Sequence, residues 1–301
     1  MLRTDGLLLL AACIWGFAFV AQRIGMEYVG PFGFNGVRFA LGCLVLLPLL
    51  VRNGIRGNGM PTRAGGLRPL DGIGGALVAG LVLFAGASFQ QVALVYTTAG
   101  NAGFITGLYV VLVPIIGIGL GHRAHAGTWL GASLAAVGLY LLSVADRFGI
   151  SPGDLLVLIS AFFWAVHVHI IGWLSPRQDP LRIAFLQNAV CSVLSLLVAG
   201  GIEENGMSRY LSAAIPILYG GVLSVGVAYT LQVVAQRKAK PAHVAIILSL
   251  EAVFAAIGGW IVLNETLSPR AIAGCILMLC GMLISQLWRT QLRGSSASGR
   301  S

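Results

Sequence analysis

Long apolar stretches, separated by charged residues, proline or glycine, occupy almost the whole chain. Each is about as long as the roughly 20 residues that a helix needs to cross a bilayer. The ten stretches cover residues 6–24, 31–51, 72–95, 99–120, 127–145, 154–173, 180–200, 211–235, 241–263 and 269–288. The pattern therefore predicts an all-α polytopic membrane protein with ten transmembrane helices.

Composition agrees with a chain that faces lipid. Hydrophobic residues make up 57% of the chain and charged residues 10%, with a mean hydropathy of +0.88. A soluble domain carries about 25% charged residues, because its surface faces water. The 41 glycines suit membrane helices, in which small residues allow close helix contact. The five cysteines lie in apolar stretches without metal-ligand spacing, so they indicate packing and neither a metal site nor a disulfide.

The net charge of +9 is distributed unevenly between the two sides of the predicted membrane. Fourteen Lys and Arg residues fall on the side of both termini, and five fall on the other or within the spans: Arg23, Arg38, Arg147, Arg209 and Arg270. Short basic loops stay in the cytoplasm. We therefore expect a multi-pass protein of a bacterial inner membrane, with cytoplasmic termini and a cytoplasmic basic tail at 289–301. The lipid bilayer explains this charge pattern, and nothing in it favours a nucleic-acid partner.

The chain also contains an internal repeat. Three pairs match at an offset of 149 residues, and later pairs match at 142 or 143: Asp5 with Asp154, Trp15 with Trp164, Pro31 with Pro180, Gln90 with Gln232, Gly131 with Gly274, and Gly138 with Gly281. The matches predict a first five-helix repeat at 1–146 and a second at 147–288. Because five is an odd number, the second repeat should cross the membrane inverted, an arrangement found in many secondary transporters.

Several segments carry a resemblance to a known family: residues 10–16, 37–39, 96–102, 130–131 with Gly138, and 250–254 followed by 263–265. Over residues 5–288 the chain resembles two EamA domains of the drug/metabolite transporter superfamily. It departs from the family's frequent pattern at Ala252, where proline is common, and at His122, where glutamate is common. The resemblance implies ten helices around a central cavity, lined mostly by spans 1, 3, 4, 6, 8 and 9. It also implies transport of amino acids, metabolites or drugs, often outward.

Ionisable residues in the hydrocarbon are candidates for function, because each costs about 2.5–3.5 kcal/mol on insertion scales. Glu251 lies in the middle of span nine. Desolvation disfavours its charged form, so it can bind a proton or a substrate ammonium, or it can link helices by a hydrogen bond. His167 on span six is the candidate second member of a proton-coupling pair. Its neighbour His169 points to another face of the helix.

Other polar and aromatic residues complete the expected cavity. Trp15 with Gln22 and Trp164 with His167 form matching stripes in the two repeats, which either stack on substrate or face lipid. Further candidates on spans 3, 4 and 8 are Ser88, Gln91, Tyr109, Tyr229 and Gln232. Arg38 lies about two turns inside span two, where it either reaches outward to water or pairs with a carboxylate or a substrate anion.

The sequence contains no HExxH, GxSxG or P-loop motif, so we expect neither an enzyme nor an ATP-driven pump, and no cofactor. The prediction is a secondary-active transporter of small amphipathic metabolites, working by alternating access, with export of aromatic or apolar amino acids as the main hypothesis. A monomer is sufficient for this activity, and protons are the expected coupling ion. Transport of a vitamin, drug or nucleotide sugar, a membrane-embedded lipid enzyme and a passive channel remain as alternatives.

The charge distribution makes a topological prediction. Reporters of membrane side fused at Ser301 and inserted into the 201–210 loop should lie on opposite sides, with Ser301 cytoplasmic. Two reporters on the same side would contradict both the number of spans and the orientation.

Overall fold

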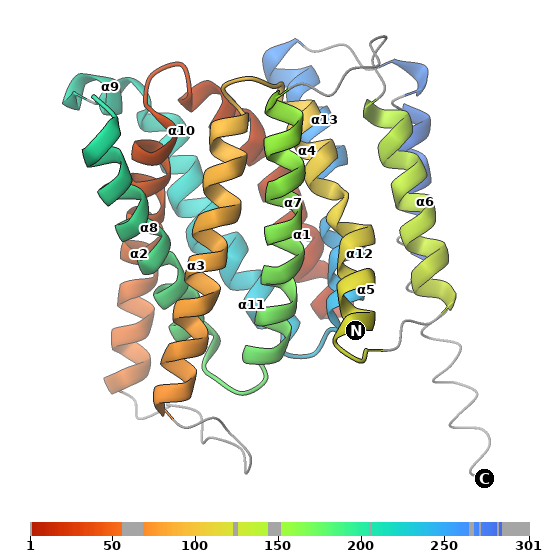
Figure 1. Ribbon diagram of the computed structural model, residues 1–301, viewed down its shortest axis with the longest axis horizontal. Coiled ribbons are helices and arrows are strands. Elements are labelled where there is room, and N and C mark those ends of the chain that lie inside the picture. Colours follow the sequence, from red (N-terminus) through yellow and green to blue (C-terminus); the bar gives the residue numbers. More distant parts are fainter. Residues whose placement is uncertain are drawn as a thin grey trace.

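A computed structural model describes residues 2–55, 69–122, 126–143, 152–204, 206–264, 268–270, 272–281 and 283–284. The predicted basic tail at 289–301 and residues 56–68 of the first basic loop lie outside them. Among the described residues every regular element is helical (Figure 1). The helices are α1 (Leu2–Gly25), α2 (Pro31–Ile55), α3 (Pro69–Ala93), α4 (Ala99–Gly107), α5 (Tyr109–Gly119), α6 (Ala126–Ser143), α7 (Pro152–Leu174), α8 (Pro180–Ile202), α9 (Met207–Ser212), α10 (Ala214–Leu218), the π-helix η1 (Tyr219–Tyr229), α11 (Thr230–Gln236), α12 (Pro241–Leu248) and α13 (Glu251–Leu263).

Eight helices, or runs of consecutive helices, are long and apolar enough to cross a membrane: Arg3–Gly25, Pro31–Asn53, Ile73–Ala93, Ala99–Gly119, Pro152–Leu174, Pro180–Ile202, Ala214–Gln236 and Pro241–Leu263. They correspond to predicted spans 1–4 and 6–9, and each end lies within three residues of its predicted position. Helix α6 occupies the fifth predicted span, and a shorter apolar helix, Ile272–Gly281, lies in the tenth. The all-α polytopic class is confirmed, whereas the count of ten spans stays a prediction.

Local sequence signals explain where several helices begin. Proline is the first residue of α2, α7, α8 and α12, a position where its fixed φ and missing N–H cost nothing. The Asp179 side chain caps α8 by accepting from the N–H groups of Leu181 and Arg182. The Glu203 carboxylate, at the end of α8, accepts from the first free N–H groups of α2, at 2.8 Å from Phe32 and 2.7 Å from Gly33. This contact joins the ends of two helices that are far apart in sequence.

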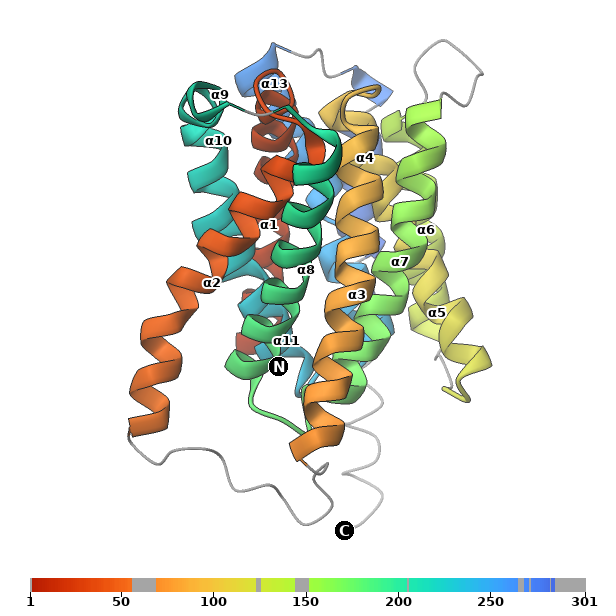
Figure 2. The ribbon, with the colours of Figure 1, turned by 60° about the vertical axis from the view of Figure 1, so that its left-hand side comes forward.

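The helices run roughly side by side and pack into one body (Figures 1 and 2). Helix α2 packs on α8 and η1, α3 packs on α7 and α8, and α1 packs on α13 and η1. Many large apolar side chains point outward: Ile215 is 81% exposed, Leu197 68% and Leu44 62%. A water-facing surface of this kind would aggregate, but in a bilayer it contacts lipid chains.

Glycines permit the closest helix contacts, as the composition indicates. At Gly16 on α1, an added Cβ would lie 2.3 Å from the Cβ of Phe254 and 2.7 Å from the carbonyl oxygen of Glu251 on α13. At Gly6, on the same helix, an added Cβ would meet nothing within 4 Å. Helix α1 therefore lies directly against the start of α13, where Glu251 is.

The two glycines provide a matched test of this packing. We expect Gly16→Ala to lower the thermal stability of the purified protein, because overpacking a tight contact costs about 1–3 kcal/mol. We expect Gly6→Ala to leave stability unchanged or slightly higher, since it adds helix propensity in open space. Melting of both variants in detergent checks this, and equal melting temperatures would contradict the close contact of α1 with α13.

Candidate functional site

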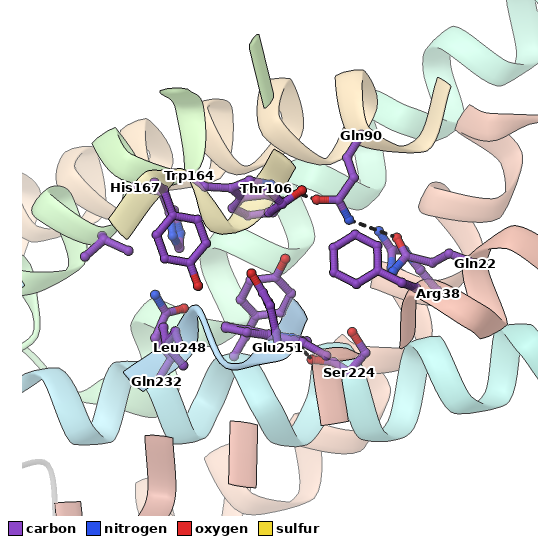
Figure 3. Close-up of a pocket in the computed structure, with 15 residues that line it drawn as sticks. Gln22, Arg38, Gln90, Thr106, Trp164, His167, Ser224, Gln232, Leu248 and Glu251 are labelled. Carbon is purple, nitrogen blue, oxygen red and sulfur yellow. Dashed lines mark hydrogen bonds between the residues drawn. The ribbon is translucent and has the colours of Figure 1, made fainter. Parts of the chain in front are cut away.

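A pocket lies among the long helices, and it comprises about 490 Å³ of space, part of it open to the surroundings. It is lined by residues of spans 1, 2, 3, 4, 6, 8 and 9, shown in Figure 3. Eight of the ten predicted site residues line it: Trp15, Gln22, Tyr109, Trp164, His167, Tyr229, Gln232 and Glu251. The structure therefore brings together side chains that are up to 236 positions apart in the sequence.

Two predicted site residues on α3 do not line the pocket. Ser88 is buried, and its hydroxyl has no hydrogen-bond partner among the described residues. Gln91 is fully buried, and its amide lies 3.5 Å from the carbonyl oxygen of Gln22. Gln90 faces the pocket instead, because one residue along a helix turns a side chain by about 100°.

The pocket has seven further lining residues that were not among the predicted site residues: Phe19, Arg38, Gln90, Thr106, Val168, Ser224 and Leu248. Arg38 and Gln90 carried a signal in the sequence, because both are strongly polar residues inside apolar stretches. Phe19, Val168 and Leu248 are ordinary apolar residues of a membrane helix, so no sequence pattern distinguishes them.

Aromatic rings form one wall of the pocket around Tyr229. The Tyr229 ring centroid lies 4.8 Å from that of Trp15, 6.0 Å from that of Phe39, 6.2 Å from that of Trp164 and 6.3 Å from that of His167. Tyr229 is the last residue of η1. A π-helix is rare and is frequently found at functional sites. The cluster is a large, rigid apolar surface suited to the apolar part of a ligand.

The polar ends of the two tryptophans are held by hydrogen bonds. The Trp15 indole N–H donates to the backbone carbonyl of Ser224 at 3.2 Å, and the Trp164 indole N–H donates to Gln90 Oε1 at 2.8 Å. The Gln90 amide N–H in turn lies 3.4 Å from Gln22 Oε1. The bond of Trp15 joins spans 1 and 8, and the two bonds of Gln90 join spans 1, 3 and 6 (Figure 3). Both predicted tryptophan stripes face the pocket.

The two histidines of α7 face different surroundings, as their spacing indicates. His167 Nε2 lies 3.0 Å from Gln187 Oε1 on α8, and its ring lines the pocket. His169 Nε2 lies 2.8 Å from the carbonyl oxygen of Val113, so it holds α7 to α5. His167 is therefore the histidine that can meet a ligand.

Glu251 is the first residue of α13 and is only 4% exposed. It lies near Tyr109, the first residue of α5. The Glu251 carboxyl and the Tyr109 hydroxyl interact with each other, although neither Glu251 Oε1 nor the hydroxyl makes a hydrogen bond of normal geometry to a described residue. Buried polar atoms are nearly always paired. Because Glu251 and Tyr109 both line the pocket, they are candidates for contact with water or a polar ligand group.

Comparison with known proteins gives the family. The model of the EamA-like transporter family matches the chain twice, over residues 2–144 and 151–286. An uncharacterized transporter of Archaeoglobus fulgidus is 34% identical over 292 residues, covering 93% of this chain and 84% of that protein. The uncharacterized inner membrane transporter YedA of Escherichia coli K12 is 25% identical over 226 residues, covering 70% of this chain and 68% of YedA.

The fold also has a solved counterpart. A protein chain with a solved crystal structure superposes on this chain with a TM-score of 0.76. The match covers 96% of this chain and 98% of the other. The sequence identity is 20%, so the likeness concerns the fold alone.

Proposed function

Because the chain belongs to the EamA-like transporter family, a family of membrane transporters rather than enzymes, we propose that it is a secondary-active exporter of small amphipathic metabolites. Amino acids with aromatic or apolar side chains are the proposed main substrates. We place it in a bacterial inner membrane, where the relative YedA is located according to its name, with both termini cytoplasmic. The pocket is the observation that carries this proposal.

The pocket's walls match an amphipathic ligand. The aromatic group around Tyr229 offers an apolar surface, and polar atoms from spans 1, 2, 3, 4, 8 and 9 converge on the same space. Small-molecule sites combine apolar and aromatic walls with polar groups that fix the orientation of the ligand. A large, multiply charged substrate would find few partners here.

Reciprocal glycine contacts support an inverted repeat. A Cβ on Gly138 would lie 2.6 Å from the carbonyl oxygen of Gly274, and a Cβ on Gly281 would lie 2.7 Å from that of Gly131. The same offset of 143 relates Gly131 to Gly274 and Gly138 to Gly281. Exchanging the repeats therefore exchanges the two contacts, as a two-fold axis requires. The tryptophan bonds agree, since Trp15 binds span 8 and Trp164 binds its counterpart, span 3.

Spans 4 and 9 are interrupted at corresponding positions. Helix α4 gives way to α5 at Leu108, and α12 gives way to α13 at Ser249 and Leu250. The N–H of Leu108 bonds to Ile105 at 3.1 Å and that of Leu250 bonds to Ile247 at 3.2 Å, which is a tightened i→i−3 turn. Interrupted helices beside a central site recur in transporters with inverted repeats. We propose that these turns let the two halves rock around the pocket in alternating access.

Glu251 is the proposed proton-coupling group. It lies at the interruption of span 9 and lines the pocket, while the corresponding position of the first repeat holds Tyr109, at an offset of 142. Tyrosine forms hydrogen bonds but does not exchange a proton near neutral pH. A carboxyl group can release its proton on one side and take one up on the other, with His167 as the second titratable group facing the pocket.

Flux through purified protein in liposomes tests the function. We expect the wild type to transport phenylalanine and related apolar amino acids faster when a pH gradient is imposed. Glu251→Gln keeps the shape and hydrogen-bonding capacity of the side chain but cannot titrate, so the gradient-dependent flux should fall by about tenfold or more. Glu27→Gln, at an exposed position near the end of α1, is the control and should match the wild type.

Two outcomes would contradict the proposal in different ways. A folded Glu251→Gln variant with wild-type flux and unchanged pH dependence would show that Glu251 only joins helices. A wild type that moves sugar phosphates, nucleotide sugars or vitamins but no amino acid would show that the substrate class is wrong.

A further inference from the structure

Arg38 is held in place from two sides. It lies on α2, is 2% exposed and lines the pocket. Its Nε donates to Asn35 Oδ1 at 3.0 Å, and Asn35 is itself fixed by a 3.1 Å bond from its amide to the carbonyl oxygen of Ala87 on α3. The guanidinium carbon lies 5.6 Å from the Phe34 ring centroid and 5.1 Å from that of Phe39. These contacts orient the guanidinium group, and among the described residues its one hydrogen bond is the Nε bond to Asn35.

The positive charge of Arg38 has no counter-charge in the part of the chain that the structure describes. No carboxylate of a described residue lies within salt-bridge distance of Arg38, in contrast to His243, which pairs with Asp5 at 2.9 Å. Arginine stays protonated in proteins, so this group cannot become neutral as a buried lysine does. A buried charge needs a partner, and the open space beside Arg38 is the pocket itself.

Other residues lining the same pocket hold four oxygen atoms that make no hydrogen bond of normal geometry in the described structure, although Glu251 and Tyr109 interact with each other. The four atoms are Glu251 Oε1, Gln232 Oε1, the Tyr109 hydroxyl oxygen and Thr106 Oγ1. All four can accept a hydrogen bond, and one belongs to a carboxyl group. An ammonium group carries three donors and a positive charge, so it matches such a set. In Figure 3, Arg38 lies with Gln22 and Gln90 toward one end of the pocket, Gln232 lies toward the other, and Glu251 lies between them.

We propose that Arg38 is the binding site for the carboxylate of a zwitterionic substrate, whose ammonium group is received by Glu251 together with Gln232 and Tyr109. This assignment rests on the proposed function and specifies how the pocket recognises an α-amino acid. The guanidinium fork binds a carboxylate through two parallel hydrogen bonds. The side chain of the substrate then faces the aromatic group around Tyr229.

When Glu251 is ionised, charge balance favours a zwitterion over a plain anion or cation. A substrate with one positive and one negative group partners both Arg38 and ionised Glu251 and leaves no net charge in the pocket. An amine without a carboxylate leaves Arg38 unpaired, and an acid without an ammonium places its charge in the same pocket as Glu251. The cost of an unpaired buried group is the usual source of strong discrimination between such analogues.

Three ligands that share one side chain test the assignment: phenylalanine, phenylalaninamide, which lacks the carboxylate, and 3-phenylpropionate, which lacks the ammonium. Binding is measured as ligand-induced thermal stabilisation of wild type, Arg38→Gln and the control Arg52→Gln, an exposed arginine on the same helix. Wild type and control should bind phenylalanine about tenfold to hundredfold more tightly than the amide. Arg38→Gln should lose this preference but keep the preference for phenylalanine over phenylpropionate.

Several results would overturn the assignment. The first is an unchanged preference in Arg38→Gln, and the second is equal loss of all three ligands in a folded variant, which would mark Arg38 as structural. If Arg38→Gln does not fold, Arg38→Lys keeps the charge without the fork and should weaken phenylalanine binding more than amide binding; an equal effect on both ligands overturns the assignment.

A parallel flux measurement separates this inference from the proposed function. Wild-type protein that transports phenylalanine but does not discriminate against the amide overturns only the role of Arg38. Wild-type protein that transports no amino acid at all overturns the proposed function.

Discussion

Lipid chains offer no hydrogen-bond partner to a polar group in a membrane span, so partners have to come from the protein or from what it binds. This constraint governs the arrangement of the described helices. Ser160 bonds to Gly86, Ser192 to Gly36 and Gln236 to Val168, each through a backbone carbonyl on another helix. Such bonds hold the spans together. Arg38 bonds to Asn35 but has no counter-charge among the described residues, and both Arg38 and Glu251 border the pocket. In the proposed site, the fold places charged side chains at the pocket, and a ligand provides their counter-charges.

The need to pair buried polar groups also links the pocket to the proposed movement of the two halves. The pocket lies where interrupted spans 4 and 9 meet the paired tryptophans of spans 1 and 6. Its two titratable acid–base groups, Glu251 and His167, belong to the second repeat. In the proposed mechanism the pocket residues stay together while the two halves rock, so that a substrate bound to Arg38 and Glu251 meets each side of the membrane in turn. Loss of a proton or a ligand leaves a buried charge unpaired, which biases the equilibrium between the two states.

Much of the fold could be predicted from the sequence, because a long apolar stretch indicates both a helix and its place in the bilayer. Eight spans and the EamA family are confirmed, and most predicted site residues line the pocket, since polar residues in apolar helices point to protein and not to lipid. The residues on α3 show the limit: Gln90, Gln91 and Ser88 are close in sequence, and only the rotation of the helix selects Gln90. Arg38 could be read as reaching outward, because helix position alone does not show that Asn35, Phe34 and Phe39 hold it inward. Nor does any local pattern predict η1, whose wider turn changes which residues face the pocket.

Alternating access requires that one pocket is reached from both sides of the membrane in turn. The most direct test places a single cysteine at Ser224, a pocket-lining residue that is 2% exposed, in a protein whose five native cysteines have been replaced. Labelling with a membrane-impermeant thiol reagent is then compared in right-side-out and inside-out vesicles. The account predicts labelling from both sides, slowed from both by phenylalanine. Labelling from one side only, or labelling that phenylalanine does not affect, would contradict it.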